Sequence, residues 1–372
     1  MLKILHAIDT SGTGGAETVF YDLTIGIDPA RFLSIPVLPG PGWLHDKLTA
    51  KGFHPQIVPS RGSFNLKYLF TLVNLIKTHK IDIIHSHLFG SNVYCSLAGI
   101  ITKTPVIATF HGFVDSDRND RLLKLKFTII NKGAMDIVFV SKHLMTFFTD
   151  KFGANTNKSH IIYNGVDTDI FQPGKSETLK QELGLAADDI IVGSIGNIRP
   201  AKGYDILLKA AAIVKKQQNN IKFVIAGEGS GYLHDKLVDL YKKLDLEDTV
   251  FFLGFRNDTA KLLHSFDYFL LSSSSEGFSI STVEAMACGV PIIATKSGGP
   301  EEIIEHKVTG LLVPPGEPDL IANAIIDLHK NSALRSTLTK NAVEMIRQKF
   351  SLDLMISQYE KRLQEIYPCK KL

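Results

Sequence analysis

Length, composition and charge narrow the class of protein. At 372 residues the chain is too long for one ordinary core, since domains average about 150 residues, so two domains are expected. Its 44% hydrophobic and 21% charged residues are typical of a globular protein. A net charge of +3 is too small to predict nucleic-acid binding. The positive surplus lies in the N-terminal half, which suits an anionic substrate or membrane surface as well as an ordinary solvated surface.

The cysteines and the N-terminus indicate a compartment. Cys95, Cys288 and Cys369 are too far apart for a disulfide framework or a metal site, which favours a reducing cytoplasm. The opening MLKILHAID carries Asp9 and predicts a first strand rather than a signal peptide. The sequence contains no run of about 18 or more uncharged apolar residues, so no transmembrane helix is expected.

The first half of the chain alternates short apolar runs with amphipathic stretches. The predicted strands are 3–7, 33–37, 56–58, 83–85, 106–109, 137–140 and 160–162. The predicted helices are 16–26, 43–51, 66–80, 90–101, 121–132 and 142–152. Strands that are apolar throughout and separated by helices predict a parallel sheet covered on both faces.

A break at residues 164–173, NGVDTDIFQP, precedes a second alternating series. Its predicted strands are 190–194, 222–226, 250–253, 268–271, 292–294 and 311–313. Its predicted helices are 176–183, 204–216, 232–244, 259–265, 281–288, 300–305, 318–330, 332–350 and 352–367. The predicted fold is therefore α/β, with two doubly wound, Rossmann-like domains at 1–166 and 176–351, joined by a linker at 167–175. Their sheets are expected to face a substrate cleft with their carboxyl edges.

Glycine loops follow the first strand of each domain. Gly14 and Gly15 open the first helix, where a backbone can approach a phosphate closely, although a tight βα turn explains them about as well. The loop after residue 196 carries two cations, Arg199 and Lys202. Cations beside a helix N-terminus are what a diphosphate needs, and the alternative is a solvated basic turn.

Three histidines, His85, His87 and His111, stand at predicted strand ends. No carboxylate or cysteine has ligand spacing to them, and we expect His85 and His87 to point to opposite faces of an extended strand. We therefore predict no metal. His85 and His87 are interpreted as structural, and His111, followed by Gly112, as a hydrogen-bond donor to substrate.

Two carboxylates mark residues 272–299. Ser281 and Glu284 have capping-box spacing, so Glu284 has a structural explanation. Glu276 precedes a glycine in a turn after a strand, where a carboxylate accepts hydrogen bonds from a polyol. The backbone amides of Phe278, Ser279 and Ile280, at the predicted helix start, suit a phosphate.

Together these residues resemble the family 4 retaining glycosyltransferases, which have the GT-B fold. The carriers are the E-x7-E spacing of Glu276 and Glu284 within EGFSISTVEAMACGVPIIATKSGGPEEII, the N-terminal GGAE, the Gly196 to Lys202 loop, AGEGSG and the late GLLVPPGEPD. The resemblance covers nearly the whole chain in the family's order. The combination is specific for the family but not for one sugar.

The resemblance implies roles for individual residues. Glu276 resembles the carboxylate that contacts the hydroxyls of the donor sugar, and Glu284 the one that binds the nucleotide ribose. Lys202 resembles the lysine that binds the donor diphosphate. The family's usual arginine after the glycine is Asn197 here, and Arg199 is predicted to replace it.

The resemblance also implies roles on both sides of the predicted cleft. Gly14 and Gly15 resemble the loop that approaches the diphosphate and acceptor, and His111 the histidine that contacts the transferred sugar. The resemblance implies that the nucleotide base lies near Phe255. The C-terminal helix, 352–372, is expected to pack back on the N-terminal domain.

The implied reaction transfers a sugar from a nucleotide-sugar donor, UDP-linked in this interpretation, to a glycan or lipid-linked acceptor. It retains anomeric configuration and needs neither metal nor other cofactor. Two alternatives stay open: a GT-B-type UDP-sugar 2-epimerase, and a non-catalytic nucleotide-sugar-binding subunit. The E-x7-E constellation favours transfer, and epimerisation of a donor without acceptor would reverse that preference.

A basic amphipathic stretch bears on the location of the protein. Lys124 and Lys126 stand among apolar and basic residues, namely Arg118, Arg121, Leu122, Leu123 and Phe127. Such a stretch suits an anionic membrane and a lipid-linked acceptor, while a surface helix with one buried face is the plainer explanation. We predict a cytoplasmic protein associated with the inner face of the membrane.

Overall fold

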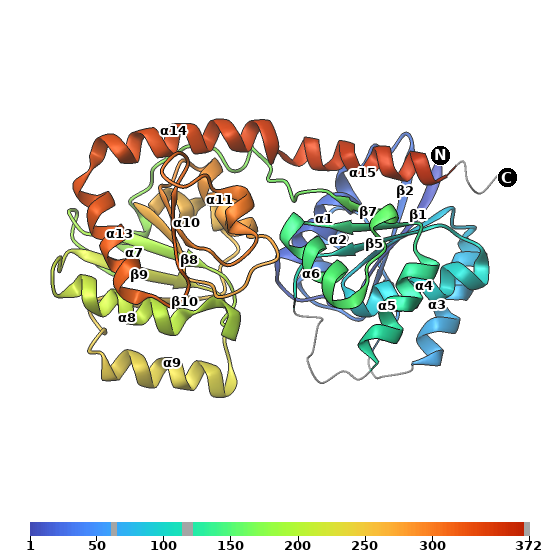
Figure 1. The fold of residues 1–372 in the computed structure, drawn as a ribbon, viewed down its shortest axis with the longest axis horizontal. Coiled ribbons are helices and arrows are strands. Elements are labelled where there is room, and N and C mark those ends of the chain that lie inside the picture. Colours follow the sequence, from blue (N-terminus) through green and yellow to red (C-terminus); the bar gives the residue numbers. More distant parts are fainter. Residues whose placement is uncertain (61–64, 114–121, 368–372) are drawn as a thin grey trace. The chain divides into compact units, whose positions relative to one another are not determined.

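The structure is a computed structural model that describes residues 1–60, 65–113 and 122–367. It divides into two compact units (Figure 1). Unit 1 holds residues 1–164 and 352–372, and unit 2 holds residues 165–351. The expected linker, 167–175, thus falls within unit 2. Each unit is built on its own parallel sheet, as the sequence predicts.

Unit 1 contains a seven-stranded sheet with the order β3-β2-β1-β4-β5-β6-β7. The strands are β1 (Leu2–Ile8), β2 (Phe32–Leu38), β3 (Gln56–Ile57), β4 (Ile83–His87), β5 (Val106–Phe110), β6 (Asp136–Phe139) and β7 (Ser159–Ile161). All paired strands are parallel, and β4 and β5 are buried along their whole length. Such strands need cover on both faces, which the helices supply.

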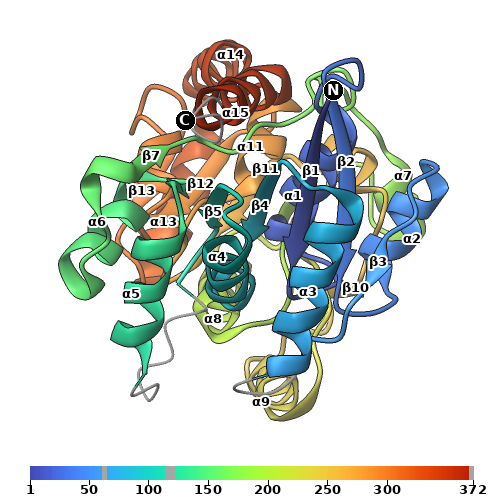
Figure 2. The ribbon, with the colours of Figure 1, turned by 90° about the vertical axis from the view of Figure 1, so that its right-hand side faces the viewer.

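The helices of unit 1 follow the strands in alternation. They are α1 (Gly15–Gly26), α2 (Trp43–Ala50), α3 (Leu66–His79), α4 (Phe89–Thr102), α5 (Leu123–Gly133) and α6 (Lys142–Phe152), with the 3-10 turn η1 at Thr156–Lys158. Helices α3, α4 and α5 lie side by side on one face of the sheet (Figure 2). Side-chain caps fix two helix starts, because Asn65 accepts from Tyr68 N and Ser141 from Leu144 N.

The C-terminal helix α15 (Leu352–Ile366) belongs to unit 1. Its Tyr359 is fully buried and its ring lies 5.1 Å from that of His85. Two ion pairs also join α15 to the rest of unit 1. Glu360 pairs with Arg31 at 3.1 Å, and Arg362 pairs with Asp136 at 2.6 Å. The apolar stripe of α15 therefore completes the core on the face of the sheet that carries the histidines.

Unit 2 contains a six-stranded sheet with the order β10-β9-β8-β11-β12-β13. The strands are β8 (Ile190–Ile195), β9 (Ile221–Ala226), β10 (Val250–Gly254), β11 (Tyr268–Leu271), β12 (Ile292–Thr295) and β13 (Leu311–Val313). The strand order reverses at β8: β9 and β10 lie on one side of it, and the chain then crosses to β11, β12 and β13 on the other side. A ligand site is expected at the carboxyl edge of such a reversal.

Helices cover both faces of this second sheet. They are α7 (Thr178–Leu183), α8 (Tyr204–Lys215), α9 (Gly231–Lys243), α10 (Thr259–Ser265), α11 (Ile280–Ala287), α12 (Pro300–Ile303), α13 (Pro318–Lys330) and α14 (Ser332–Lys349), with the 3-10 turn η2 at Pro200–Lys202. Figure 1 shows α8 and α13 on one side of the sheet and α11 and α14 on the other. Close packing is visible at Gly193, where a Cβ atom would come within 2.0 Å of the Phe266 ring.

Two predicted boundaries are wrong in ways that matter for function. Strand β4 continues to His87 rather than ending at residue 85, because it pairs with both β1 and β5 up to that position. Helix α11 begins at Ile280, one residue before the predicted start. In the described part of the chain, no helix is both long and apolar enough to span a membrane.

Candidate functional site

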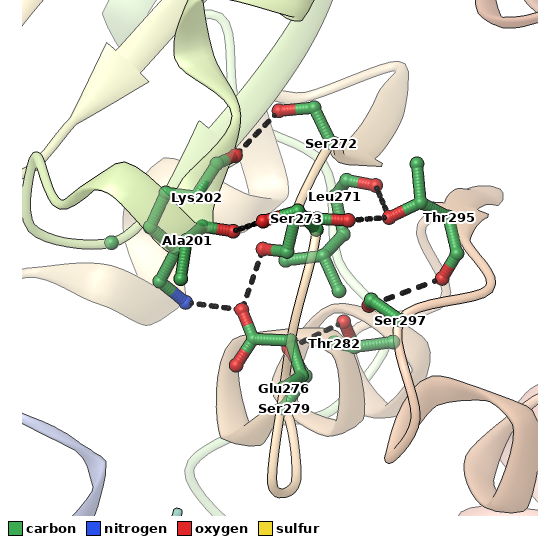
Figure 3. Close-up of polar contacts among 12 residues, drawn as sticks. Ala201, Lys202, Leu271, Ser272, Ser273, Glu276, Ser279, Thr282, Thr295 and Ser297 are labelled. Atoms are coloured by element: carbon green, nitrogen blue, oxygen red, sulfur yellow. Dashed lines mark hydrogen bonds and ion pairs between the residues drawn. The ribbon is translucent and has the colours of Figure 1, made fainter. Parts of the chain in front are cut away.

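The carboxylate of Glu276 lies in the turn that follows β11, at the carboxyl edge of the unit 2 sheet. Glu276 N donates to Ser297 O at 2.7 Å, and Gly299 N donates to Glu276 O at 2.9 Å, which ties the turn to the loop after β12. The side chain is fixed as well, since Oε1 accepts from Lys202 Nζ at 2.8 Å (Figure 3). Among the described residues, Oε2 accepts no hydrogen bond, so it is the carboxylate atom open to a ligand.

A buried serine fixes the same carboxylate oxygen. Ser273 is fully buried, and its hydroxyl donates to Glu276 Oε1 at 2.6 Å. The Ser273 carbonyl accepts in turn from the buried hydroxyl of Thr295 on β12 (Figure 3). The sequence analysis does not single out Ser273. Its position two residues beyond a strand and three before a glutamate is the signal that could have identified Ser273.

The loop of Lys202 is held against the same segment. Ser272 Oγ donates to Lys202 O at 2.9 Å. Gly203 has φ +62°, and a Cβ atom there would come within 2.3 Å of Ser272 O, so only glycine fits this contact without strain. The structure thus brings together Lys202 and Glu276, which are 74 positions apart in the sequence.

Tyr204 and Gly227 hold the loop after β8. The Tyr204 hydroxyl donates to Gly196 O at 2.6 Å, and burial raises the pKa of Tyr204, so the phenol stays protonated as a donor. A Cβ atom on Gly227 would come within 2.0 Å of Gly196 O. The GEGSG segment therefore makes room for a neighbouring loop.

Asn197 and Arg199 show how this chain handles its departure from the family pattern. Asn197 Oδ1 accepts from Glu228 N at 3.1 Å, so the asparagine braces one loop against the next. Arg199 is exposed and forms no ion pair within the described residues. Its guanidinium is thus uncommitted and lies three residues from Lys202. Whether it replaces the usual arginine stays a prediction.

The start of α11 overturns the capping-box interpretation of Glu284. The N-cap is Ser279, in extended conformation, and Ser281 lies inside the helix. The Ser279 hydroxyl accepts from Thr282 Oγ1 at 2.8 Å instead of capping a backbone amide. Glu284 therefore does not have the capping-box role, and its ribose-binding role stays a prediction.

Residues flanking α11 and β10 complete the predicted donor set. Phe278 is buried and packs on Phe350, with ring centroids 5.9 Å apart. It leads into the N-terminal amides of α11 at Ser279 and Ile280. Phe255 follows β10 and is 40% exposed, so its ring is accessible at the same sheet edge. The arrangement in unit 2 can hold an anion near Lys202 and a polyol near Glu276.

In unit 1 the first glycine loop contains a carboxylate that the sequence analysis did not single out. Gly14 stands before α1 in extended conformation, and a Cβ atom there would meet Glu17 Oε2 at 2.5 Å. Glu17 is buried and accepts from Thr10 Oγ1 at 2.7 Å. The GGAE segment is thus a loop closed by its own glutamate, with Gly15 as the first helical residue.

The histidines of unit 1 form a chain across the sheet. His87 Nδ1 lies 2.9 Å from His111 Nε2, and His85 Nε2 lies 3.0 Å from Thr109 Oγ1. The expectation that His85 and His87 point to opposite faces is wrong, because residues two apart on a strand share one face. Their ring centroids lie 4.2 Å apart. His6 on β1 joins them, 5.4 Å from His85.

Burial keeps these imidazoles neutral. It lowers the pKa of His6 and of His111 to about 3, and it lowers the pKa of His85 and of His87 well below the usual range. Among the described residues, His6, His85 and His87 place one ring nitrogen each within 4.8 Å of the others, close enough to consider a metal ion. Each of the three has one hydrogen bond, and His6 Nδ1 and His87 Nε2 are buried without a partner. The absence of a metal stays a prediction.

Helix α5 shows which of its residues can face a membrane. Leu123 and Phe127 are buried in the unit 1 core, so they are not available to a lipid surface. Lys124 is exposed, and so are Leu122 and Leu125. Arg118 and Arg121 lie outside the described residues. The core therefore uses most of the apolar face, as the plainer interpretation of the sequence has it.

Comparison with known proteins identifies the family of the chain. A family model described as Glycosyl transferases group 1 matches residues 175–345, and one described as Glycosyltransferase Family 4 matches residues 13–170. The chain belongs to family 4 of the glycosyltransferases. Its two parallel α/β sheets form the GT-B fold of that family, as predicted.

Individual relatives are glycosyltransferases of different specificity. N-acetyl-alpha-D-glucosaminyl L-malate synthase of Bacillus anthracis is 28% identical over 80% of this chain and 78% of its own length. D-inositol 3-phosphate glycosyltransferase of Kribbella flavida is 28% identical over 71% of this chain and 66% of its own length. The structure of Anabaena Alr3699/HepE in complex with UDP-glucose matches with TM-score 0.89 and 26% identity, over 98% of this chain and 100% of that one.

Proposed function

We propose that this glycosyltransferase moves a hexosyl or N-acetylhexosaminyl group from a UDP-linked donor to a glycan or lipid-linked acceptor, with retention of anomeric configuration. The observation that carries the proposal is the contact of Lys202 Nζ with Glu276 Oε1 at the carboxyl edge of β8 and β11. It sets a phosphate-binding cation beside a hydroxyl-binding carboxylate, the two kinds of group that a sugar joined to a diphosphate needs close to each other.

The donor is assigned to unit 2, residue by residue. Lys202 and Arg199 bind the diphosphate, together with the amides of Phe278, Ser279 and Ile280. Glu276 accepts hydrogen bonds from the sugar, Glu284 from the ribose, and Phe255 lies against the base. The UDP assignment is supported by the UDP and UDP-glucose complexes of Anabaena Alr3699/HepE, which is 26–27% identical to this chain.

The chemistry follows from where charge develops. Cleavage of the anomeric C–O bond leaves positive charge on the sugar and negative charge on the departing diphosphate. Lys202, Arg199 and the α11 amides stabilise that negative charge through preorganised donors, each worth roughly 3 kcal/mol of barrier. These groups supply the role that a metal ion has in other transferases, so we propose a reaction without metal or other cofactor.

Unit 1 contributes Gly14, Gly15 and His111, which stand at the carboxyl edge of β1 and β5. We assign the two glycines to the diphosphate and the acceptor, and His111 to the transferred sugar. We propose synthesis of a cell-surface polysaccharide or glycolipid in the cytoplasm, with contact to the inner membrane face through Lys124 and its neighbours. The exposed Leu122 and Leu125 beside that lysine support the contact.

A donor screen tests the proposal. Purified protein is incubated with UDP-, GDP- and ADP-linked hexoses and N-acetylhexosamines, with and without polyol, glycan and polyprenyl-phosphate acceptors, and nucleoside diphosphate release is measured. The proposal predicts release that depends on both a UDP-sugar and an acceptor. Interconversion of the donor at C2 without an acceptor would establish an epimerase instead, and binding of donors with no turnover would establish a non-catalytic subunit.

A further inference from the structure

The last residue of β4 and the first residue after β5 touch at the edge of the unit 1 sheet. His87 Nδ1 and His111 Nε2 lie 2.9 Å apart, and the two rings are stacked with an interplanar angle of 14°. The remaining ring nitrogens, His87 Nε2 and His111 Nδ1, are both buried and have no hydrogen-bond partner. Each imidazole therefore has one committed nitrogen and one open nitrogen.

The shared contact fixes how many protons the pair carries. Both imidazoles are neutral, so each has one N–H, and the contact between them needs one proton. If His87 donates, its Nε2 is a bare acceptor and the second proton sits on His111 Nδ1. If His111 donates, its Nδ1 is bare and the second proton sits on His87 Nε2.

The surroundings of the two open nitrogens decide between these arrangements. His87 is fully buried, and the rings of His85 and Phe20 lie 4.2 Å and 5.3 Å from it, so an N–H at Nε2 would have no acceptor. A buried N–H without an acceptor is the rarer and costlier defect in proteins. The His111 residue is only partly buried, and it precedes Gly112, where an added Cβ atom would meet nothing within 4 Å among the described residues. The His111 side of the pair therefore lies nearer open space, where a substrate oxygen can serve as the acceptor for Nδ1–H.

We propose that His87 is a positioning residue that fixes the tautomer of His111, so that His111 presents Nδ1–H as a hydrogen-bond donor to substrate. His87 donates through Nδ1, and His111 accepts through Nε2. The rings of His85 and Phe20 pack against His87, and His85 is itself hydrogen-bonded to Thr109. This packing holds the His87 ring in its orientation. The ligand of His111 is then an oxygen, a hydroxyl of the transferred sugar, in keeping with the function proposed above on which this step rests.

Isotope-edited NMR tests the assignment without any donor. The full chain is labelled with 15N-histidine, and the ring signals of His111 are identified by their loss in His111→Gln. In the wild type, His111 Nδ1 is expected to give a pyrrole-type resonance and Nε2 a pyridine-type resonance. A pyridine-type Nδ1 in the wild type overturns the proposal, whatever happens in any variant.

Two variants of His87 form a matched pair. The amide of His87→Asn stands where Nδ1 stood and can still donate to His111, whereas the amide of His87→Gln stands where Nε2 stood and cannot. We expect His87→Asn to keep the His111 tautomer of the wild type and to lose less kcat/KM than His87→Gln. His87→Gln should give a mixed tautomer and a roughly 10-fold lower kcat/KM, the effect of one lost hydrogen bond.

The two readouts separate the two claims. An unchanged His111 tautomer in a folded His87→Gln protein overturns the positioning role. A changed tautomer with equal kcat/KM in both variants supports the positioning role and overturns the contact between His111 and the sugar. If no nucleotide sugar is turned over at all, the proposed function fails, and the NMR result still decides the tautomer.

Discussion

Ser273 Oγ lies 2.6 Å from Glu276 Oε1, and the backbones of both residues are tied to β12 and the loop after it, through Thr295 Oγ1 and Ser297 O. The same oxygen accepts from Lys202 Nζ. Because Oε1 is occupied by two donors from the protein, the carboxylate is oriented before any ligand arrives. Glu276 is then oriented to bind a sugar hydroxyl through Oε2. The conformational entropy of its side chain is lost on folding, so binding does not have to offset that cost.

Ser273→Ala should weaken catalysis more than folding. The variant loses a hydrogen bond to a charged group, worth about 1.5–3 kcal/mol, so kcat/KM for the donor is expected to fall at least ~10-fold. Ser274→Ala is the matched control, since that exposed hydroxyl contacts Ala201 O at 3.4 Å and not Glu276. Steady-state kinetics with melting curves measures both. Equal kcat/KM in the two variants would remove the orienting role of Ser273.

Gly227→Ala should destabilise unit 2. The added Cβ atom would meet Gly196 O at 2.0 Å, and because the obstacle is backbone, the loop after β8 must move. Overpacking of this kind costs about 1–3 kcal/mol or more. Calorimetric unfolding of the variant is compared with that of Gly40→Ala, where the added atom meets nothing within 4 Å. A melting temperature like that of the wild type in Gly227→Ala would contradict the described packing.

Unit 1 should lose stability in mild acid. The pKa values of His6, His85, His87 and His111 are lowered in the folded state, while an unfolded histidine titrates near 6.5. Their contribution is thus complete above about pH 6.5 and is lost as the pH falls toward about 3. Two to four such histidines predict a loss of about 2–5 kcal/mol per pH unit below 6. The groups around them are the Ser34 and Thr109 hydroxyls, the Phe20 ring and, as a further titratable side chain, Tyr359.

Trp43, the single tryptophan, lies in α2 and reports on unit 1 alone. Urea unfolding is followed by its fluorescence at several pH values between about 5 and 8, the range that the histidine titration covers. His6→Gln should reduce the slope by the share of one histidine, and His54→Gln, at an exposed position, should not change it. A free energy of unfolding that is flat over this range would show that the cluster is not buried in its neutral form.

Membrane association predicts a dependence on charge. Wild-type protein should float with anionic liposomes and not with neutral ones, and Lys124→Glu with Lys126→Glu should reduce the floated fraction several-fold, since each lysine near an anionic surface contributes about 1 kcal/mol. Lys222→Glu with Lys242→Glu, in unit 2, is the control for net charge. Flotation that is the same in both double variants would remove the α5 contact.

Much of the fold was predictable because the periodicity is strong. Some strands are apolar throughout, such as residues 268–271, and they alternate regularly with helices. This pattern predicts a parallel α/β protein. The proposed ligand-binding residues Glu276 and Lys202 were predictable from motif spacing. Their direct contact was not, because it joins residues 74 positions apart through a turn whose path depends on tertiary packing.

The remaining errors have local physical causes. The helix start at Ile280 was missed because Ser279 and Ser281 compete as N-caps, and Ser279 takes that position without a side-chain cap bond. The cluster of His6, His85, His87 and His111 was missed because pairing between β1 and β4 places His6 beside His85, which no local pattern reveals. Ser273 was missed because a serine run resembles an ordinary loop.

The central claim is that Glu276 and Lys202 bind an activated sugar for transfer. The most direct test is acceptor-dependent UDP release from the best donor of the screen, measured for the wild type and for Glu276→Ala at matched melting temperature. The account predicts turnover in the wild type and a loss of at least ~100-fold in the variant, the size expected when a group that contacts the reacting sugar is removed. Turnover at the wild-type rate in Glu276→Ala would contradict it.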